Sequence, residues 1–302
     1  MELMNEVEKY LNTKNYHVDH FFKIYSFANE NIDGYMQYFD LREKSLLTVG
    51  SSCDQLLNAN LNGCNDITVC DICPLVEYYY YLKLASILTF DREELLYFLC
   101  RTKYKDNREY NPHLFTKKNF RLVKDTLKSL DYESHNFWEY IFENYSREFI
   151  ELLFQYGINS SRSITYCNRY LKNDYNYNQL KKTISNLSVS FINDDITSFK
   201  IDRTFDNIWL SNVAHYIEED QISEMINHNI DMLSSNGQML ISYFWSKDMT
   251  IKGFPIKALL NSEYKQKIVS GAYDKKYKDS ILVYRKIWYN ENRRFDLSEQ
   301  RS

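Results

Sequence analysis

The chain has 302 residues and 44% of them are hydrophobic, so it can bury a substantial core as one large domain or as a domain with a sizeable insertion. The formal net charge of −4 excludes a general electrostatic attraction to nucleic acid. With only 7 glycines and 3 prolines, the composition fits neither a sandwich of many short strands nor long flexible linkers.

Targeting and membrane segments are not expected. The first residues, MELMNEVEKYLN, carry acidic charges and no apolar segment, unlike a signal peptide. No run of about 18 apolar residues occurs, so no membrane-spanning helix is expected. Six scattered cysteines predict reduced thiols and a cytoplasmic location: Cys53, Cys64, Cys70, Cys73, Cys100 and Cys167.

The N-terminal part, residues 1–44, is predicted to be a helical segment that precedes the main domain. Within it, Tyr25–Lys44 is expected to hold a short helix bounded by polar turns. Ser45–Gly50 is a compact apolar run that ends at a glycine, which favours a buried strand. Leucines at helical spacing then predict a helix over Asp54–Leu61, and Gly63 follows where that helix should end.

The remaining chain alternates between strand-like and helical patterns. Asp66–Ile72 is a second apolar run, and Pro74 can begin the next helix because a first-turn residue needs no amide donor. From Pro74 to about Leu187 apolar residues recur every three or four positions, as in helices. An amphipathic helix is predicted to end at Asn236-Gly237. Four strand-like segments surround it: Leu187–Ile196, Phe205–Asn212, Gly237–Trp245 and Ser280–Trp288. This alternation predicts an α/β, Rossmann-like fold with a mostly parallel sheet.

The turn after the first strand is a candidate ligand site. Gly50 at the strand end would let the backbone approach a ligand, but Ser51–Asp54 replace the further glycines that a pyrophosphate needs. Asp71 lies 21 residues beyond Gly50, at the end of the second strand, where a carboxylate can accept both ribose hydroxyls. The pattern therefore favours a nucleoside without phosphates, and S-adenosylmethionine is such a molecule. The alternative is that Asp71 only caps a helix.

Three stretches, LTVGSSCDQLLNA, DICPLVEYYYYLKLASI and FDNIWLSNVAHYI, carry a family resemblance. The chain resembles the class I S-adenosylmethionine-dependent transferases, and it is most similar to the 3-amino-3-carboxypropyl transferases of betaine-lipid synthesis and their bacterial relatives. The resemblance covers roughly residues 25–88 and 188–245. It implies a Rossmann-like methyltransferase fold over 45–302 with a helical insertion at 88–187, which we expect to act as a lid over the strand ends.

The resemblance also implies site residues. Gly50 and Ser51 would lie against the amino-acid end of the cofactor, Asp71 would hold its ribose, and Ser211 and Asn212 would face the transferring group. The full set expected to bind the cofactor is Glu30, Gly50, Ser51, Ser52, Asp54, Asp71, Ile72, Asp194 and Asp195. Asp54 would form a salt bridge or hydrogen bond with the loop, Ile72 would flank adenine, and either Asp194 or Asp195 would accept from the adenine amino group. The expected catalytic set is Ser211, Asn212 and His215. His215 would be a general base, or else a cap on the following helix.

The favoured reaction is transfer of a 3-amino-3-carboxypropyl group to a small-molecule or lipid acceptor, releasing methylthioadenosine. Methyl transfer to a small molecule or RNA uses the same adenosine contacts, and the sequence does not decide between them. A third reading is a catalytically degenerate protein that binds the cofactor, motivated by the altered glycine loop.

Other features favour simpler readings. Cys70 and Cys73 form a CxxC without a second ligand pair, so no metal is expected. Glu30 and Asn31 could cap a helix instead of closing over a cofactor. Arg101–Lys128 contains nine basic and three acidic residues, which could bind phosphates, anionic lipid or RNA, or form a solvated helix face. Because the whole chain is acidic, we expect the solvated face and no nucleic-acid partner.

Overall fold

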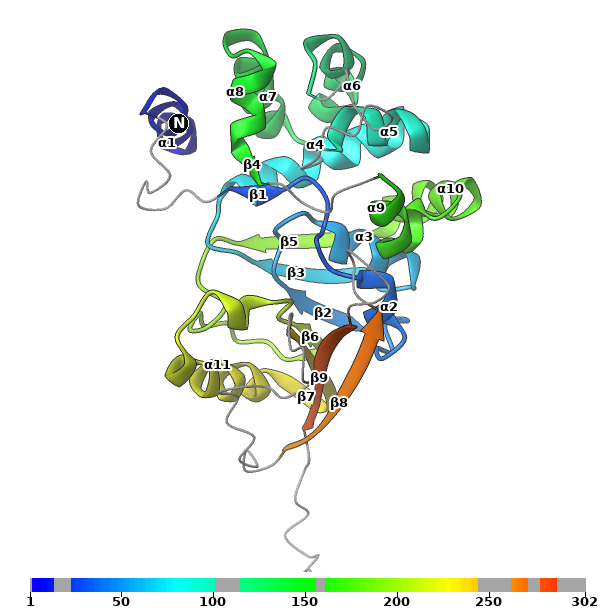
Figure 1. Ribbon diagram of the computed structural model, residues 1–302, viewed down its shortest axis with the longest axis vertical. Coiled ribbons are helices and arrows are strands. Elements are labelled where there is room, and N and C mark those ends of the chain that lie inside the picture. The colour runs from blue at the N-terminus through cyan, green and yellow to red at the C-terminus, as the bar shows by residue number, and fades with distance from the viewer. Residues whose placement is uncertain are drawn as a thin grey trace, which may run out of the picture.

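The structure is a computed structural model that describes residues 2–13, 23–100, 115–155, 161–243, 262–270 and 278–286. Its centre is a seven-stranded sheet with the strand order β5-β3-β2-β6-β7-β9-β8 (Figure 1). The strands in chain order are β2 (Ser45–Thr48), β3 (Asp66–Cys70), β5 (Ser188–Ile192), β6 (Phe205–Trp209), β7 (Leu233–Tyr243), β8 (Ser262–Ser270) and β9 (Lys278–Lys286).

The sheet is parallel from β5 to β7. The pairs β3–β5, β2–β3, β2–β6 and β6–β7 are all parallel, whereas β9 runs antiparallel to both β7 and β8. The strands that follow β2 in the chain lie on both sides of it, with β3 and β5 on one side and β6 and β7 on the other. Ligands bind at such a switch point, outside the carboxyl ends of the strands. The predicted mostly parallel, Rossmann-like sheet is confirmed.

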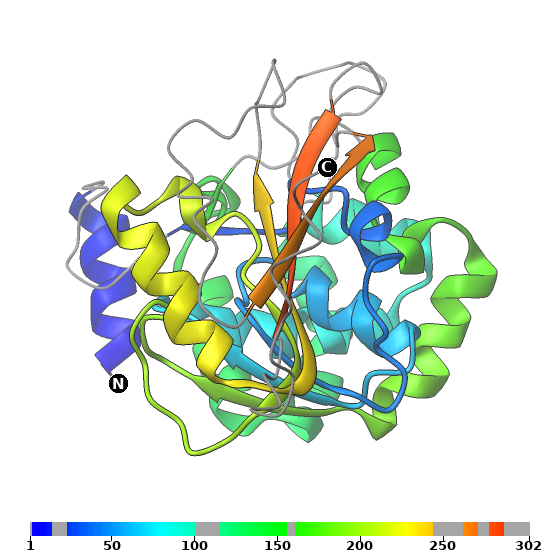
Figure 2. The same cartoon turned by 90° about the horizontal axis from the view of Figure 1, so that it is seen from below.

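Alternating side chains of the strands bury both faces of the sheet. Leu46 and Val69 belong to one apolar core, and their neighbours Leu47 and Cys70 belong to a second core on the opposite face. This period of two is the one expected of a strand, and both faces are apolar because helices cover both. The first core takes side chains from α3 (Asp54–Leu61) and α4 (Leu75–Thr89), and the second takes them from α11 (Glu219–Asp231). Figure 2 shows α11, in yellow, on the other side of the sheet from the light-blue α3.

The predicted insertion is built on α4. Its helices are α5 (Arg92–Leu99), α6 (Lys117–Leu130), α7 (Tyr132–Asn144), α8 (Arg147–Ile150), α9 (Ser161–Cys167) and α10 (Asp174–Thr183). Figure 1 shows α5–α8 gathered around α4, beyond the β5 edge of the sheet. Trp138 of α7 donates its indole N–H to the Tyr78 carbonyl at 2.8 Å, and both α6 and α7 contribute to the same core as α3. The insertion is thus continuous with the sheet domain, and its closure as a lid stays a prediction.

A short strand pair connects the N-terminal segment to the insertion. After α1 (Glu2–Thr13), the short strand β1 (Ile24–Tyr25) pairs in parallel with β4 (Phe154–Gln155) of the insertion. The predicted helical pattern of the insertion is therefore wrong at β4, because this backbone takes its partner from a distant segment. The short helix expected within Tyr25–Lys44 is α2 (Ile32–Met36).

In the C-terminal half, one prediction is corrected and one strand was missed. The helix expected to end at Asn236-Gly237 ends at Asp231, and Gly237 lies inside β7. The register between β6 and β7 shifts near Phe205, where a Cβ on Gly237 would lie 3.1 Å from the Phe205 carbonyl oxygen. The glycine therefore marks a strand irregularity instead of a helix end. β8 was not predicted, because this edge strand is rich in polar residues.

Candidate functional site

The loop after β2 is held in an unusual backbone conformation. Ser51 and Cys53 have φ angles of 41° and 63°, in the left-handed region that side chains disfavour. The Cys53 N–H donates to the Gly50 carbonyl at 2.7 Å and closes the turn. A Cβ on Gly50 would lie 2.1 Å from Cγ1 of Val76 and 2.9 Å from Cγ1 of Val69. A glycine is therefore needed at this position for the close packing of α4 on the strand end, in addition to any close approach of a ligand.

Asp71 lies beside this loop, as its spacing from Gly50 predicts. Its Oδ2 accepts from the backbone N–H groups of Gly50 and Ser51, at 3.1 and 3.0 Å. Its Oδ1 accepts from the Cys73 N–H at 2.9 Å, just before α4, so the capping alternative describes part of its environment. Burial raises the pKa of the half-buried Asp71 carboxyl, and the three N–H groups lower it. The carboxylate thus joins the ends of two adjacent strands.

Glu30 reaches the carboxyl ends of β6 and β7 from the N-terminal segment. It is buried, and its two carboxylate oxygens accept from the hydroxyls of Ser211 and Ser242. Ser211 follows β6 with a φ of 52°, so the third left-handed residue at this edge is also a predicted site residue. Asn31 accepts from the Gly34 N–H at 3.0 Å and caps α2, which confirms the capping alternative for Asn31.

The other predicted catalytic residues follow Ser211. Asn212 is half-buried, and its Oδ1 accepts from the Ser211 hydroxyl at 3.3 Å. His215 ends the short 3-10 helix Val213–His215, but its side chain lies outside the described residues. The structure therefore brings Ser211 and Asn212 together with Glu30, and the role of His215 as a base stays a prediction.

Asp194 and Asp195 follow β5 (Ser188–Ile192), next to the end of β3. Both are exposed, and Asp195 Oδ1 accepts from the Thr197 N–H at 2.8 Å. Asp194 Oδ1 accepts from the Asp195 N–H at 2.7 Å. Ile72, beside Asp71, is 46% exposed, which leaves an apolar surface at the place expected to flank adenine. These positions are compatible with the predicted contacts and do not decide which aspartate faces adenine.

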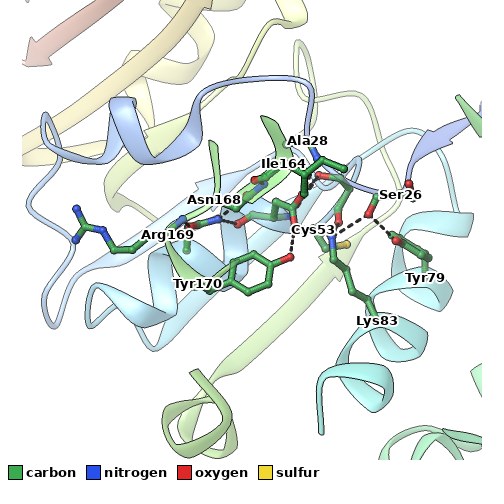
Figure 3. A network of polar contacts seen from close by, with 12 residues as sticks. Ser26, Ala28, Cys53, Tyr79, Lys83, Ile164, Asn168, Arg169 and Tyr170 are labelled. Atoms are coloured by element: carbon green, nitrogen blue, oxygen red, sulfur yellow. Dashed lines mark hydrogen bonds and ion pairs between the residues drawn. The ribbon is translucent and has the colours of Figure 1, made fainter. Parts of the chain in front are cut away.

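Ser52 and Asp54 are buried and belong to a polar network with Lys83 and Tyr170, which Figure 3 shows. Asp54 Oδ1 lies 2.5 Å from Lys83 Nζ and accepts from the Tyr170 hydroxyl at 2.7 Å. Asp54 Oδ2 accepts from the Ala28 N–H at 2.6 Å and from the Ser52 hydroxyl at 3.2 Å. Because Asp54 is fully buried, it can affect a ligand only through the loop that it holds.

Three residues of the site were not predicted from the sequence. Lys83 and Tyr170 complete the network around Asp54, and Ser242 completes the contacts of Glu30. Burial lowers the pKa of Lys83, and the Asp54 carboxylate raises it. The available signal for Lys83 was a lysine within the apolar run EYYYYLKLASI, because a cation on a buried helix face needs a partner.

All six cysteines are free thiols and buried. Cys70 donates to the Asp194 carbonyl at 3.3 Å, and burial raises the pKa of this thiol. Among the described residues, no group of three or more His, Cys, Asp or Glu side chains is placed to hold a metal ion.

Within the described part of the chain, no helix is long and apolar enough to cross a membrane. The described part of the basic stretch lies on α6, where Lys117 and Lys124 each lie 3.7 Å from a carboxylate oxygen of α7, on Glu143 and Glu139 respectively. These pairs are typical of a solvated helix face. Residues 101–114 of the stretch lie outside the described residues.

No family model and no curated protein matches this sequence. Among solved structures, the N-methyltransferase NodS from Bradyrhizobium japonicum in complex with S-adenosyl-L-homocysteine is 10% identical, with a TM-score of 0.41 over 95% of this chain and 99% of NodS. The glycopeptide N-methyltransferase MtfA is 8% identical, with a TM-score of 0.44 over 87% of this chain and 97% of MtfA. The magnesium protoporphyrin IX methyltransferase ChlM from Synechocystis with bound SAM is 9% identical, with a TM-score of 0.35 over 84% of this chain and 76% of ChlM.

The Rossmann-like methyltransferase fold is confirmed, and it follows from the strand order of this chain and its antiparallel final strand. The molecule belongs to that fold class, and this fold does not by itself determine the reaction, which depends on the residues of the site.

Proposed function

We propose that this protein is an S-adenosylmethionine-dependent transferase that binds its cofactor across the carboxyl ends of β2, β3 and β6. The observation that carries the proposal is the contact of the Asp71 carboxylate with the Gly50 and Ser51 N–H groups. It brings an acidic side chain and a tight backbone turn to the switch point of a parallel sheet. Such a turn beside an acidic residue at the end of the second strand is suited to a nucleoside.

The residues at this edge fit a nucleoside. A carboxylate has about four acceptor sites. Oδ2 of Asp71 accepts two N–H groups and Oδ1 accepts one, which leaves one site on Oδ1 for one ribose hydroxyl instead of the two expected from the sequence. Ile72 offers exposed apolar surface for a base, and either Asp194 or Asp195 can accept from an adenine amino group. Gly50 and Ser51 would border the amino-acid end of the cofactor.

The second half of the proposed site is formed by Glu30, Ser211 and Asn212. Glu30 accepts from the Ser211 hydroxyl, and this bond supports the left-handed backbone of Ser211 just after β6. This arrangement would orient an acceptor toward the reacting carbon and exclude water from it. His215, one turn further, would take the proton that the acceptor loses.

S-adenosylmethionine supplies an electrophilic carbon attached to a sulfonium sulfur. The acceptor forms a bond to this carbon, the carbon–sulfur bond breaks with its electron pair going to sulfur, and the acceptor loses a proton. We favour transfer of the 3-amino-3-carboxypropyl group to a small-molecule or lipid acceptor, on the family resemblance of the three quoted stretches. Methyl transfer is the alternative, because the same adenosine contacts serve both reactions.

Binding is tested by titration calorimetry with S-adenosylmethionine and S-adenosylhomocysteine. Asp71→Asn should weaken binding by about 1.5–3 kcal/mol, the scale of a hydrogen bond to a charged group. Asp66→Asn is the matched control, because Asp66 begins the same strand, at its opposite end, and pairs with Arg203. Equal affinity of wild-type protein and a folded Asp71→Asn variant would exclude the ribose contact.

The transferred group is tested by incubation with S-adenosylmethionine and a metabolite extract, followed by mass spectrometry. Methylthioadenosine should form in step with an acceptor that gains the four-carbon amino-acid unit. Accumulation of S-adenosylhomocysteine alone would identify a methyltransferase. Binding without either product would support a protein that only binds the cofactor.

A further inference from the structure

A buried ion pair lies directly beneath the loop after β2. Lys83 and Asp54 have side chains that are 1% and 0% exposed, with Nζ and Oδ1 2.5 Å apart. Polar groups from four segments of the chain surround the pair, and Figure 3 shows Lys83 among those of Ser26, Tyr79 and Tyr170. They come from the N-terminal segment, the loop, α4 and the insertion, through Ser26, Ser52, Tyr79 and Tyr170 respectively.

The ammonium group of Lys83 holds two backbone carbonyls. Nζ donates to the Ser52 carbonyl at 2.8 Å and to the Ser26 carbonyl at 3.0 Å, and it lies 4.3 Å from the centre of the Phe27 ring. The Ser52 carbonyl stands between Ser51 and Cys53, the two residues with left-handed backbone. A left-handed non-glycine residue persists where surrounding contacts determine it. The Lys83 bond is such a contact.

The carboxylate of Asp54 completes the arrangement from the other side. Oδ2 accepts from the Ala28 N–H, and Oδ1 accepts from the Tyr170 hydroxyl. Ala28 is two residues from Glu30, which contacts Ser211 at the end of β6. The ion pair thus contacts the loop on one side of the proposed site and the segment that carries Glu30 on the other.

A simple stabilising role does not account for this pair. A buried ion pair loses the hydration of both charges, and apolar residues of similar size are often as stable in its place. Three of its bonds go to backbone groups of the loop and of the N-terminal segment, which lie outside the sheet ladder. These bonds determine the conformation of two segments that border one site.

We propose that Lys83 and Asp54 are positioning residues that hold the Gly50–Asp54 loop and the Ser26–Glu30 segment in the shape that the cofactor requires. The proposal rests on the proposed function for the identity of the ligand. The pair takes over the task that further glycines perform in other loops of this kind, because it makes the left-handed conformation of Ser51 and Cys53 the stable one.

The double variant Asp54→Asn/Lys83→Met removes both charges at nearly constant volume, so no unpaired charge is left in the core. Cys53 is a built-in reporter of the loop, because its thiol is fully buried. Pulsed alkylation with iodoacetamide, read by peptide mass spectrometry, measures its exposure. Cys64 and Cys70, also buried and outside the loop, report on opening of the whole domain.

We expect Cys53 of the double variant to react about tenfold or more faster than in the wild type, with less than about a twofold change at Cys64 and Cys70. Unchanged labelling of Cys53, or equal acceleration at all three cysteines, would overturn the proposal. Tyr170→Phe removes only one hydrogen bond, and it should accelerate Cys53 selectively but less. If the double variant does not fold, the labelling of Cys53 in Tyr170→Phe tests whether the ion pair holds the loop. Ser86→Ala, which removes a buried hydroxyl from α4 away from the loop, should leave all three rates unchanged.

Calorimetry with S-adenosylhomocysteine separates this proposal from the proposed function. We expect the affinity to fall about tenfold or more in the double variant and to stay at the wild-type value in Ser86→Ala. Accelerated labelling of Cys53 with unchanged affinity would overturn the positioning role. If the wild-type protein binds neither S-adenosylhomocysteine nor S-adenosylmethionine, the proposed function fails, and the labelling of Cys53 still decides whether the pair holds the loop.

Discussion

Gly50 offers a direct test of why a glycine follows β2. Its Cβ would lie 2.1 Å from Cγ1 of Val76 and 2.9 Å from Cγ1 of Val69, well inside van der Waals contact. Val76 is buried in α4, and a β-branched side chain in a helix has one strongly preferred rotamer, so it cannot simply turn away. Gly50→Ala should therefore force apart the strand end and the helix.

The expected magnitudes follow from the packing. Adding a methyl group to a filled core costs about 1–3 kcal/mol in the free energy of unfolding. Val76→Ala removes two methyl groups and should cost about 1–3 kcal/mol, from about 0.5–1.5 for each carbon lost. In the double variant Gly50→Ala/Val76→Ala, the new Cβ occupies part of the space that the Val76 side chain leaves. Its loss of stability should be smaller than the sum of the single losses by about 1–2 kcal/mol, with Val69 limiting the recovery.

Urea unfolding followed by circular dichroism gives the free energy of unfolding for the wild type, the two single variants and the double variant, which form a double-mutant cycle. Equal m-values would show that the same surface is exposed in each. If the two losses add within about 0.5 kcal/mol, Val76 is not the neighbour that excludes a side chain at Gly50, and the packing explanation is refuted.

Three further variants test other parts of the fold. Burial raises the pKa of Asp206, but hydrogen bonds led by the N–H and hydroxyl of Ser45 outweigh it, so the folded pKa lies below the usual value. Asp206→Asn should lower the free energy of unfolding at pH 7, and the difference from wild type should shrink below about pH 4 as the carboxyl is protonated, in urea titrations at several pH values. Gly63→Ala should cost about 1 kcal/mol or more, because Gly63 has a φ of 93°; an unchanged Tm would contradict this. Trp138→Phe removes the indole donor to the Tyr78 carbonyl and part of a fully buried ring, and it should cost about 1–3 kcal/mol in one cooperative calorimetric transition, whereas two transitions would indicate a separate insertion domain.

The part of the fold that could be predicted is the part determined by local signals. The helix Asp54–Leu61 has the predicted limits, and Gly63 has the left-handed backbone that ends a helix. Strands β2 and β3 lie within their predicted ranges, because apolar runs between turn residues specify buried parallel strands. These signals also locate Gly50 and Asp71 at neighbouring strand ends.

The remaining contacts of the site depend on residues far apart in the chain. Lys83 lies 29 residues from Asp54, and Ser242 lies 212 residues from Glu30. No periodicity connects such positions, and a lysine within an apolar helix indicates only that a partner exists. β8 escaped prediction for the opposite reason, since an edge strand needs little apolar character and therefore leaves a weak pattern.

These contacts explain how the loop keeps its shape although it lacks the further glycines. A loop of several glycines adopts left-handed backbone at low cost wherever the fold requires it. Here Ser51 and Cys53 adopt it under the constraint of the Asp71 carboxylate on one side and the Lys83 ammonium on the other. In a glycine-rich loop the residue type permits the left-handed backbone, whereas in this loop tertiary contacts stabilise it, and both can produce the same backbone shape. The altered loop is therefore no argument against cofactor binding, and substitutions at Lys83 should affect it as glycine substitutions would affect a glycine-rich loop.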